Sequence, residues 1–249
     1  MTEGSPDTSL VDERLVQALS ASVINTIDDV IKLMEDFDNI LPSNDGLKWF
    51  NLLYLRVTQA VQRHPPAEGW ENPRFLERLA VIFAGLYFTA IASWKREEKS
   101  VASAWAPLFK ARHSRNIMRV QFAIAGMNAH INHDLAIALV QTSEGEGIVP
   151  RGGSPEHRDF EKVNTILEVV AEEVKQFLAT GVVEEIDQDL GQLDDVIALW
   201  SVRKARETAW TNGEILWQLR RIPVLSDAFL KNLDRLVGLS TRGLLIPVG

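Results

Sequence analysis

One stretch of the sequence decides the fold: residues 114–141, SRNIMRVQFAIAGMNAHINHDLAIALVQ. Its apolar residues cover most directions around a helix, which is typical of a helix buried in the middle of a protein. The apolar set consists of Ile117, Val120, Phe122, Ile124, Ile131, Leu135, Ile137, Leu139 and Val140. We therefore expect an all-α, single-domain helical bundle built around a buried central helix.

Five polar residues interrupt this apolar helix: Asn128, His130, Asn132, His133 and Asp134. A buried polar group without a partner costs about 1–3 kcal/mol, so each of them needs a hydrogen-bond partner, a metal or a ligand. At 3.6 residues per turn the two histidines and the aspartate lie on one side, and the two asparagines lie roughly opposite. On the histidine side, the small residues Gly126 and Ala123 leave room for a neighbouring helix or a ligand.

Two imidazoles and a carboxylate within one helical turn predict a divalent metal site for Zn²⁺, Mn²⁺ or Fe²⁺. The predicted ligands are His130, His133, Asp134 and, from a later helix, Asp159, with Glu161 or His113 as further sources. The alternative is a hydrogen-bonded core network, in which His130 pairs with Asp134 and the asparagines tie helices together. The helix lacks the H-E-x-x-H pattern of zinc peptidases, so spacing alone leaves both interpretations open.

Two other groups of charged residues are candidates for function. Arg203 and Arg206 lie three residues apart on one helical face, where they can clamp a carboxylate or phosphate. The alternative is ion pairing with the acidic run before them, from Glu184 to Asp195, or with Asp134. Asp28 and Asp29 are similar to the aspartate-rich helix of isoprenoid cyclases. Acidic residues in the first turn of a helix also have a simpler explanation, the helix dipole.

Working outward, helical spacing dominates the chain and β-hairpin signals are nearly absent. Residues 1–9 are polar and predicted to be disordered, and residues 10–249 are predicted to form one domain. The longest predicted loop runs from Thr142 to Pro155, and loops of that length are often functional or mobile. Helices are predicted at residues 10–19, 24–37, 47–62, 73–94, 159–180, 196–218 and 225–237.

Composition narrows the classes of function. The 249 residues carry a formal net charge of -8, which argues against a general nucleic-acid binder. Cysteine is absent, so disulfides, thiolate nucleophiles and cysteine-ligated metals are excluded. Residues 1–9 contain no apolar segment of a signal peptide, and the apolar windows are too short or too interrupted to span a bilayer. We expect a cytoplasmic protein without a membrane span.

The segment Gly126-Met127-Asn128-Ala129-His130-Ile131-Asn132-His133-Asp134-Leu135 closely resembles an uncharacterised family of bacterial all-helical proteins, a domain of unknown function. The resemblance covers most of the chain from about Ile27 onward and implies that the histidines and the aspartate matter together. Further matching pieces are Asp45-Gly46, Phe50-Asn51, Leu53-Tyr54, Phe83 to Phe88, Trp105, Pro107-Leu108-Phe109, Phe160, Val163-Asn164, Trp200-Ser201-Val202-Arg203 and Ala205-Arg206.

The first expectation for function is a metal-dependent enzyme, most plausibly a hydrolase, that acts on a small molecule. Its catalytic residues would be His130, His133, Asp134 and Arg203. The second is a metal-free binding protein, or an isoprenoid-type cyclase or isomerase, that uses the same pocket. The third is a structural or interaction module whose polar core only sets helix register. Oligomeric state is not predicted.

Overall fold

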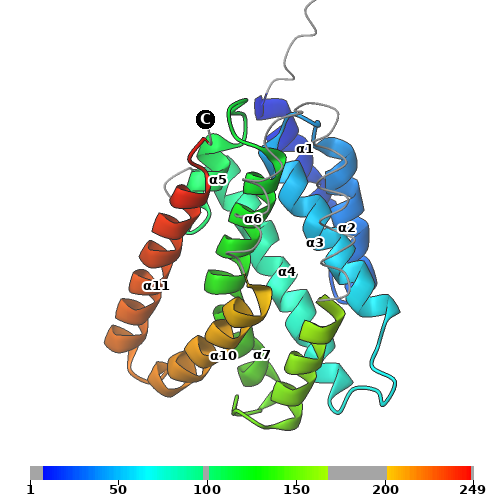
Figure 1. The fold of residues 1–249 in the computed structure, drawn as a ribbon, viewed down its shortest axis with the longest axis vertical. Helices are drawn as coiled ribbons and strands as arrows, with labels where there is room; N and C mark the ends of the chain where they lie inside the picture. The colour runs from blue at the N-terminus through cyan, green and yellow to red at the C-terminus, as the bar shows by residue number, and fades with distance from the viewer. Residues whose placement is uncertain (1–7, 98–100, 168–200, 248–249) are drawn as a thin grey trace, which may run out of the picture.

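A continuous helical rod runs through the middle of the molecule (Figure 1). It consists of α6 (Arg119–Ala129), one turn of π-helix, η2 (His130–Asp134), and α7 (Leu135–Glu146). The computed structural model describes residues 8–97, 101–167 and 201–247. In it, α3 and α11 pack against α6, and α4 and α10 pack against α7. The prediction of an all-α bundle around a buried central helix is confirmed.

The helices before the rod begin where the sequence provides caps. They are α1 (Thr8–Ala21), α2 (Ile27–Ile40), α3 (Gly46–Arg63) and α4 (Pro73–Arg96). Thr26 and Asp29 form a capping box at the start of α2, so Asp29 has the structural role that its position favours. Asp45 caps α3, and Pro73 occupies the first turn of α4.

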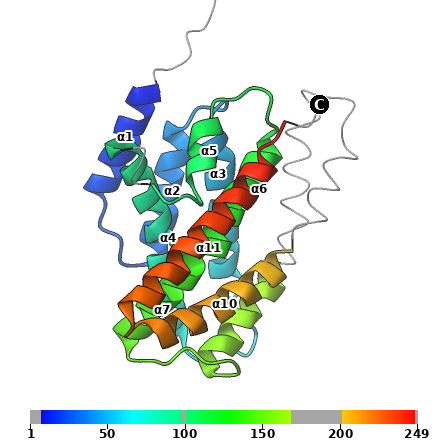
Figure 2. The same ribbon diagram turned by 90° about the vertical axis from the view of Figure 1, so that its left-hand side faces the viewer.

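The remaining helices cover the other side of the rod. They are the short α5 (Ala106–Ala111), which precedes the rod, and, after it, a helical segment at residues 155–167, α10 (Val202–Leu219) and α11 (Pro223–Leu244). Figure 2 shows α11 running along α6 while α10 crosses near α7. The C-terminal end of the described chain packs on the rod, because Gln121 Nε2 donates to the carbonyl oxygens of Leu244 and Ile246.

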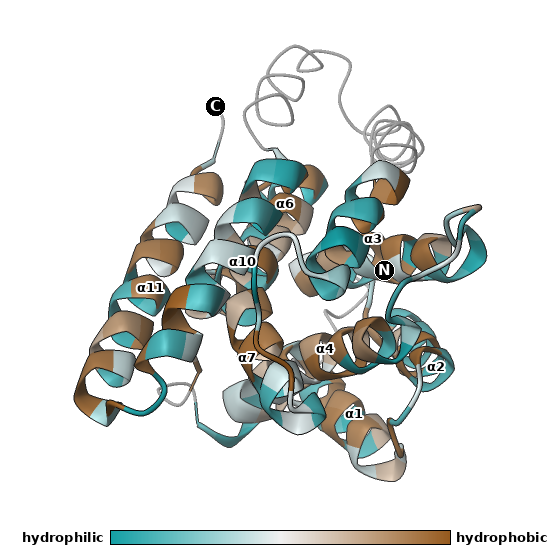
Figure 3. Ribbon diagram, turned by 90° about the horizontal axis from the view of Figure 1, so that it is seen from below, coloured by the Kyte–Doolittle hydropathy of each residue, from teal (hydrophilic) through white to brown (hydrophobic). Residues whose placement is uncertain are grey.

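Apolar residues dominate α4 and α7 in the hydropathy view, whereas polar residues are prominent on α10 (Figure 3). Within the described residues, α4 is the one helix whose length and composition would allow it to cross a membrane. The same composition is typical of a core helix, and α4 packs on α1, α2 and α7.

The prediction of a long loop from Thr142 to Pro155 is wrong. The central helix continues to Glu146, and Gly147 ends it in the left-handed conformation with φ 68°. The helix continues because Thr142 and Ser143 are fully buried, and the Thr142 hydroxyl donates to the Ala138 carbonyl oxygen. The connection is therefore residues 147–154. The rod also begins later than predicted, at Arg119.

Helix ends elsewhere differ from the predictions by a few residues. The helix predicted at 24–37 lies at Ile27–Ile40 because Thr26 provides the cap, and the last helix extends to Leu244. The later part of the predicted 159–180 helix, and the predicted start at residue 196, lie outside the described residues.

Candidate functional site

Asp134 collects three hydrogen-bond donors at the end of the π-turn. Its Oδ1 atom lies 2.7 Å from Nδ1 of His133, and its Oδ2 atom lies 3.0 Å from Nδ1 of His130. Trp105 Nε1 also donates to Oδ2, at 2.9 Å. The two histidines and the aspartate that the sequence places on one side are therefore brought together, with the carboxylate between the imidazoles.

The π-turn is a local feature that helical periodicity does not reveal. The N–H of Leu135 donates to the carbonyl oxygen of His130, five residues earlier, instead of the usual four. Such an insertion widens one turn of a helix and is frequent at functional sites. Here the widened turn contains Asp134 and the two histidines that bond to its carboxylate.

The three groups differ in the charge that they favour. Burial disfavours the Asp134 anion, but hydrogen bonds from His130 and His133 outweigh that effect and hold its pKa below the ordinary value. Burial likewise opposes the charged form of His133, yet its hydrogen bond to Asp134 raises its pKa. Asp234 adds to this effect, since its Oδ1 atom lies 3.7 Å from His133 Nε2. The arrangement favours an ion pair between His133 and Asp134.

His130 favours the opposite protonation state. Burial lowers the pKa of its imidazole, and the hydrogen bond to Asp134 does not offset this. Because a carboxylate can only accept, Nδ1 of His130 carries the hydrogen, and Nε2 is left with a lone pair. No described group forms a hydrogen bond with this buried Nε2 atom. His130 thus offers one unused acceptor inside the protein.

Aromatic rings surround the His130 imidazole. The Phe83 ring stacks on it with 3.6 Å between ring centroids and an interplanar angle of 6°. Tyr54 meets it edge-on at 4.6 Å, and Phe50 at 5.8 Å. Gly126 allows this approach, because a Cβ atom there would overlap the Phe50 ring. The prediction that Gly126 leaves room beside the histidines is confirmed, and an aromatic ring fills that room.

His130 also lies in the wall of a cavity of about 290 Å³ between α3, α4, the central rod and the 155–167 segment. This volume is at the lower end of the range of ligand pockets, roughly 300–1,000 Å³. Most of the lining is apolar. The lining residues are Ile27, Tyr54, Val57, Thr58, Val61, Gln62, Trp70, Pro73, Leu76, Glu77, Leu79, Ala80, Phe83, Met127, His130, Ile131, Leu135, Phe160, Val163, Leu167 and Arg206.

Tyr54 is the second polar aromatic residue in that wall. Burial is the main reason that the pKa of its phenol is raised, and the Asp134 charge adds to it. The hydroxyl therefore stays protonated, and it can donate a hydrogen bond but not serve as a base.

The two arginines singled out in the sequence take different positions. Arg203 lies at the surface, with 42% of its side chain exposed, and its Nη1 atom is 3.8 Å from Glu161 Oε2. This partner is neither Asp134 nor the acidic run from Glu184 to Asp195, which lies outside the described residues. Arg206 instead is buried and lines the cavity. The structure therefore separates the pair and places Arg206, not Arg203, beside the candidate site.

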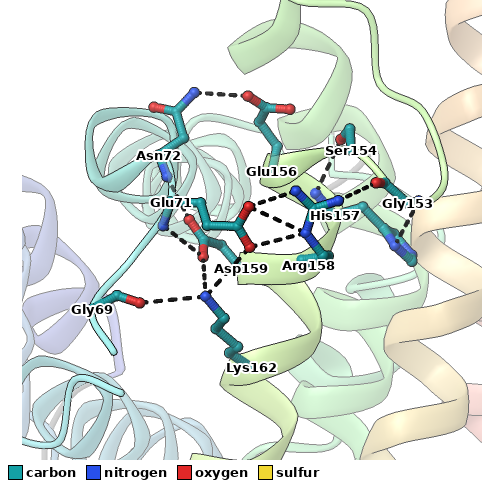
Figure 4. A network of polar contacts seen from close by, with 10 residues as sticks. All are labelled: Gly69, Glu71, Asn72, Gly153, Ser154, Glu156, His157, Arg158, Asp159 and Lys162. Carbon is teal, nitrogen blue, oxygen red and sulfur yellow. Dashed lines mark hydrogen bonds and ion pairs between the residues drawn. The ribbon is translucent and has the colours of Figure 1, made fainter. Parts of the chain in front are cut away.

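Asp159 belongs to a different network (Figure 4). Its carboxylate accepts from the backbone N–H groups of Glu71 and Asn72, at 3.0 and 2.7 Å, and from Lys162 Nζ at 3.1 Å. Arg158 pairs with the Glu71 side chain beside it. These contacts tie the α3–α4 connection to residues 153–162, and they use the oxygens that the predicted metal site requires.

In the described part of the chain, no three His, Asp or Glu side chains are arranged to hold a metal ion. The predicted ligands His130, His133 and Asp134 are together, but their shared hydrogen bonds use both Nδ1 atoms and both carboxylate oxygens. Asp159 is held elsewhere. The metal site stays a prediction, and the geometry does not add support to it.

The asparagines on the opposite side have the structural role considered for them. Asn132 Nδ2 donates to Asn128 Oδ1 at 3.0 Å, and Asn128 Nδ2 donates to Thr241 Oγ1 at 3.0 Å. They join the central rod to α11.

Sequence reasoning missed Trp105 as a partner of Asp134 and Phe83 as the ring stacked on His130. Both lie within segments that match the family pattern, but no spacing rule relates them to residues so distant along the chain. A family model, described as a family of unknown function (DUF5995), matches residues 27–247. Neither the curated proteins nor the solved structures that were compared gave a match.

Proposed function

Since the chain belongs to the family of unknown function (DUF5995), we propose its function from its own residues: it binds a small, mainly apolar molecule beside His130 without a metal. His130 Nε2 accepts a hydrogen bond, or a proton, from a polar group of that molecule. This is the metal-free binding protein or isomerase among the expectations from the sequence.

One observation carries the proposal. His130 lines a mainly apolar cavity, and no described group forms a hydrogen bond with its buried Nε2 atom. An unsatisfied buried acceptor costs about 1–3 kcal/mol, and a ligand that donates to it recovers that cost. Apolar lining with few polar groups is the usual composition of a small-molecule site.

The neighbouring groups suit Nε2 to proton transfer. Asp134 fixes the Nδ1–H tautomer and would stabilise the imidazolium that forms when Nε2 takes a proton. The aromatic rings around the imidazole keep it out of water and hold its plane. In these terms His130 is the candidate base, Asp134 is its positioning residue, and His133 supplies the positive charge that balances Asp134.

The metal-dependent hydrolase stays a weaker proposal, because few nitrogen atoms of the two histidines remain available to bind a metal. A metal at this site would have to use Nε2 of His130, because the Nδ1 atoms already bond to Asp134. Nε2 of His133 faces Asp234 on α11 instead. We expect protein purified without a histidine tag to contain no stoichiometric zinc, manganese or iron. Stoichiometric metal that is lost in His130→Asn would favour the hydrolase.

Binding of a neutral probe tests the proposal. At about 30 Å³ per water molecule, the cavity holds the equivalent of roughly ten waters. 1-Octanol has a similar size, an apolar chain and one hydroxyl donor, and its binding can be measured by titration calorimetry. Ala80→Phe fills the cavity and should abolish binding. Ala92→Phe places the same ring on the same helix outside the lining and should leave binding unchanged.

His130→Phe isolates the hydrogen bond, because it keeps an aromatic ring and removes the acceptor. We expect it to weaken 1-octanol binding about tenfold, while circular dichroism still shows a folded helical protein. Failure of the wild type to bind 1-octanol, or equal binding by Ala80→Phe, would contradict the proposed function.

A further inference from the structure

We propose that the ligand is a monocarboxylate whose apolar chain carries a hydroxyl group, that Arg206 binds its carboxylate, and that the hydroxyl donates to His130 Nε2. This inference rests on the proposed function, since it names the chemical class that the same cavity accepts. Arg206 is an unusual residue for such a wall. The described lining contains two charged residues, Arg206 and Glu77. Glu77 is exposed, whereas Arg206 is buried.

The Arg206 guanidinium is held rigidly by neutral groups. Its Nε atom donates to Asn164 Oδ1 at 2.6 Å, and its Nη2 atom donates to the Phe160 carbonyl oxygen at 2.8 Å. Its Cζ atom lies 3.9 Å from the centroid of the Phe160 ring, in a cation–π contact. These contacts fix the orientation of the planar guanidinium group, but none of them places a negative charge beside it.

The nearest carboxylate is shared with other cations. Glu161 reaches Arg206 only through Asn164, whose Nδ2 atom donates to Glu161 Oε2 at 3.1 Å. The same oxygen lies 3.8 Å from Nη1 of the exposed Arg203. Among the described residues, no carboxylate forms a direct ion pair with Arg206.

A buried cation without a direct partner is costly. Burial lowers the pKa of Arg206 to about 10, and the attraction of Glu161 does not offset this effect. Even so, the side chain remains charged at neutral pH. Arginine is retained in such places mainly where its planar fork binds a carboxylate or phosphate. Within the cavity, a ligand anion can supply the missing opposite charge.

The cavity favours a carboxylate over a phosphate. A phosphate monoester brings nearly two negative charges, and the described lining provides one cation for them. A carboxylate brings one charge, which a single guanidinium matches with two parallel hydrogen bonds. Most of the remaining lining is apolar side chains from α3, α4, the central rod and the 155–167 segment, which suit a hydrocarbon chain.

A comparison of octanoate, methyl octanoate and 1-octanol tests the inference by titration calorimetry at pH 7. These probes have similar chains, and only octanoate carries a charge. We expect the wild type to bind octanoate at least about tenfold more tightly than 1-octanol or the ester, because hydrogen bonds to charged groups are the stronger ones. Arg206→Met should remove this preference while 1-octanol still binds.

Arg203→Met is the matched control, since it removes the same charge one turn earlier on the same helix but at the surface. It should keep the wild-type preference. Arg206→Lys keeps the charge without the fork and should give an intermediate preference. If circular dichroism shows that Arg206→Met does not fold, the inference is tested by the preference for octanoate in the wild type and in Arg206→Lys.

The outcomes separate this inference from the proposed function. Equal binding of octanoate and 1-octanol by the wild type, or an unchanged preference in folded Arg206→Met or in Arg206→Lys, overturns the carboxylate assignment and leaves the cavity as a site for neutral molecules. Binding of none of the probes by the wild type overturns the proposed function itself, and this inference with it.

Discussion

At the scale of single residues, the chemistry centres on one carboxylate that holds two imidazoles in different protonation states. Asp134 pairs with a His133 that favours its charge and orients a His130 that favours neutrality. His133 balances the negative charge of Asp134 within the core. The unused lone pair belongs to Nε2 of His130, the residue that lies in the cavity wall. Both the stability of the core and its reactivity therefore depend on Asp134.

Asp134→Asn should lower the free energy of unfolding by about 3 kcal/mol. Removing one partner of a buried pair leaves the other charge uncompensated, and here that charge is on His133. Urea denaturation at pH 7 measures the loss. Asp38→Asn is the control, because Asp38 pairs with Lys48 near the surface and should cost less than about 1 kcal/mol. A similarly small loss for Asp134→Asn would contradict the account.

The histidines predict a maximum in the contribution of this site to stability near pH 6.5, their ordinary pKa. The pKa of His133 is raised on folding, so its contribution is fully present below 6.5 and is lost as pH rises through the folded value. The pKa of His130 is lowered on folding, so its contribution is present above 6.5 and is lost as pH falls through its folded value.

Urea denaturation between pH 5 and pH 9 tests this dependence, with the difference between variant and wild type taken at each pH. His133→Gln should remove the decline above about pH 6.5, and His130→Gln should remove the decline below it. If His133→Gln still loses stability above pH 6.5 as the wild type does, the role assigned to His133 is contradicted.

At the scale of elements, close packing of α3 on α6 brings the Phe50 ring against the His130 imidazole. Gly126→Ala should lower the free energy of unfolding by about 1–3 kcal/mol, because the added methyl group overlaps that ring. Gly85→Ala is the matched control on α4. A Cβ atom there meets nothing within 4 Å, so alanine should raise stability by about 0.5–1 kcal/mol. Thermal denaturation compares the two, and equal effects would contradict the packing.

The α3–α4 connection depends on Asp159 in the network of Figure 4. Asp159→Ala leaves the N–H groups of Glu71 and Asn72 without their acceptor and should cost about 2 kcal/mol. Glu71→Gln breaks the exposed pairs with Arg158 and Lys162, but leaves those N–H groups their acceptor, and should cost less than about 1 kcal/mol. Urea denaturation distinguishes them. A loss of bound metal in Asp159→Ala, without a loss of stability, would restore its predicted role as a ligand.

The helices were largely predictable, because capping residues and the spacing of apolar residues are local features of the sequence. Pro73, Asp45 and the apolar spacing of residues 47–62 place helix boundaries within a few residues. The predicted loop from Thr142 to Pro155 was wrong because Gly145 and polar residues resemble loop composition, whereas burial of Thr142 and Ser143 in the assembled core keeps them helical. Tertiary packing overrode local preference there.

At the scale of the whole molecule, the candidate site was only partly predictable. Helical spacing correctly placed His130, His133 and Asp134 together, because they lie within one turn. The π-turn, the Trp105 hydrogen bond and the stacked Phe83 ring arise from contacts between distant segments. The same limit applies to Arg203 and Arg206, whose different burial depends on residues 160–164 packing against α10.

The bundle as a whole brings these separate features together at the proposed binding site. The central rod places His130 in the cavity wall, α3 and α4 supply apolar walls, and α10 supplies Arg206. Each contribution comes from a different part of the chain, so the site exists only in the folded molecule.

Long-range ¹H–¹⁵N correlation spectra of the histidine side chains report which ring nitrogen carries hydrogen and whether a ligand contacts it. At pH 7 we expect a neutral His130 with hydrogen on Nδ1 and a bare Nε2, and a change in the Nε2 resonance when 1-octanol is added but not when octane is added. A doubly protonated His130, hydrogen on Nε2, or an Nε2 resonance unchanged at saturating 1-octanol would contradict this expectation.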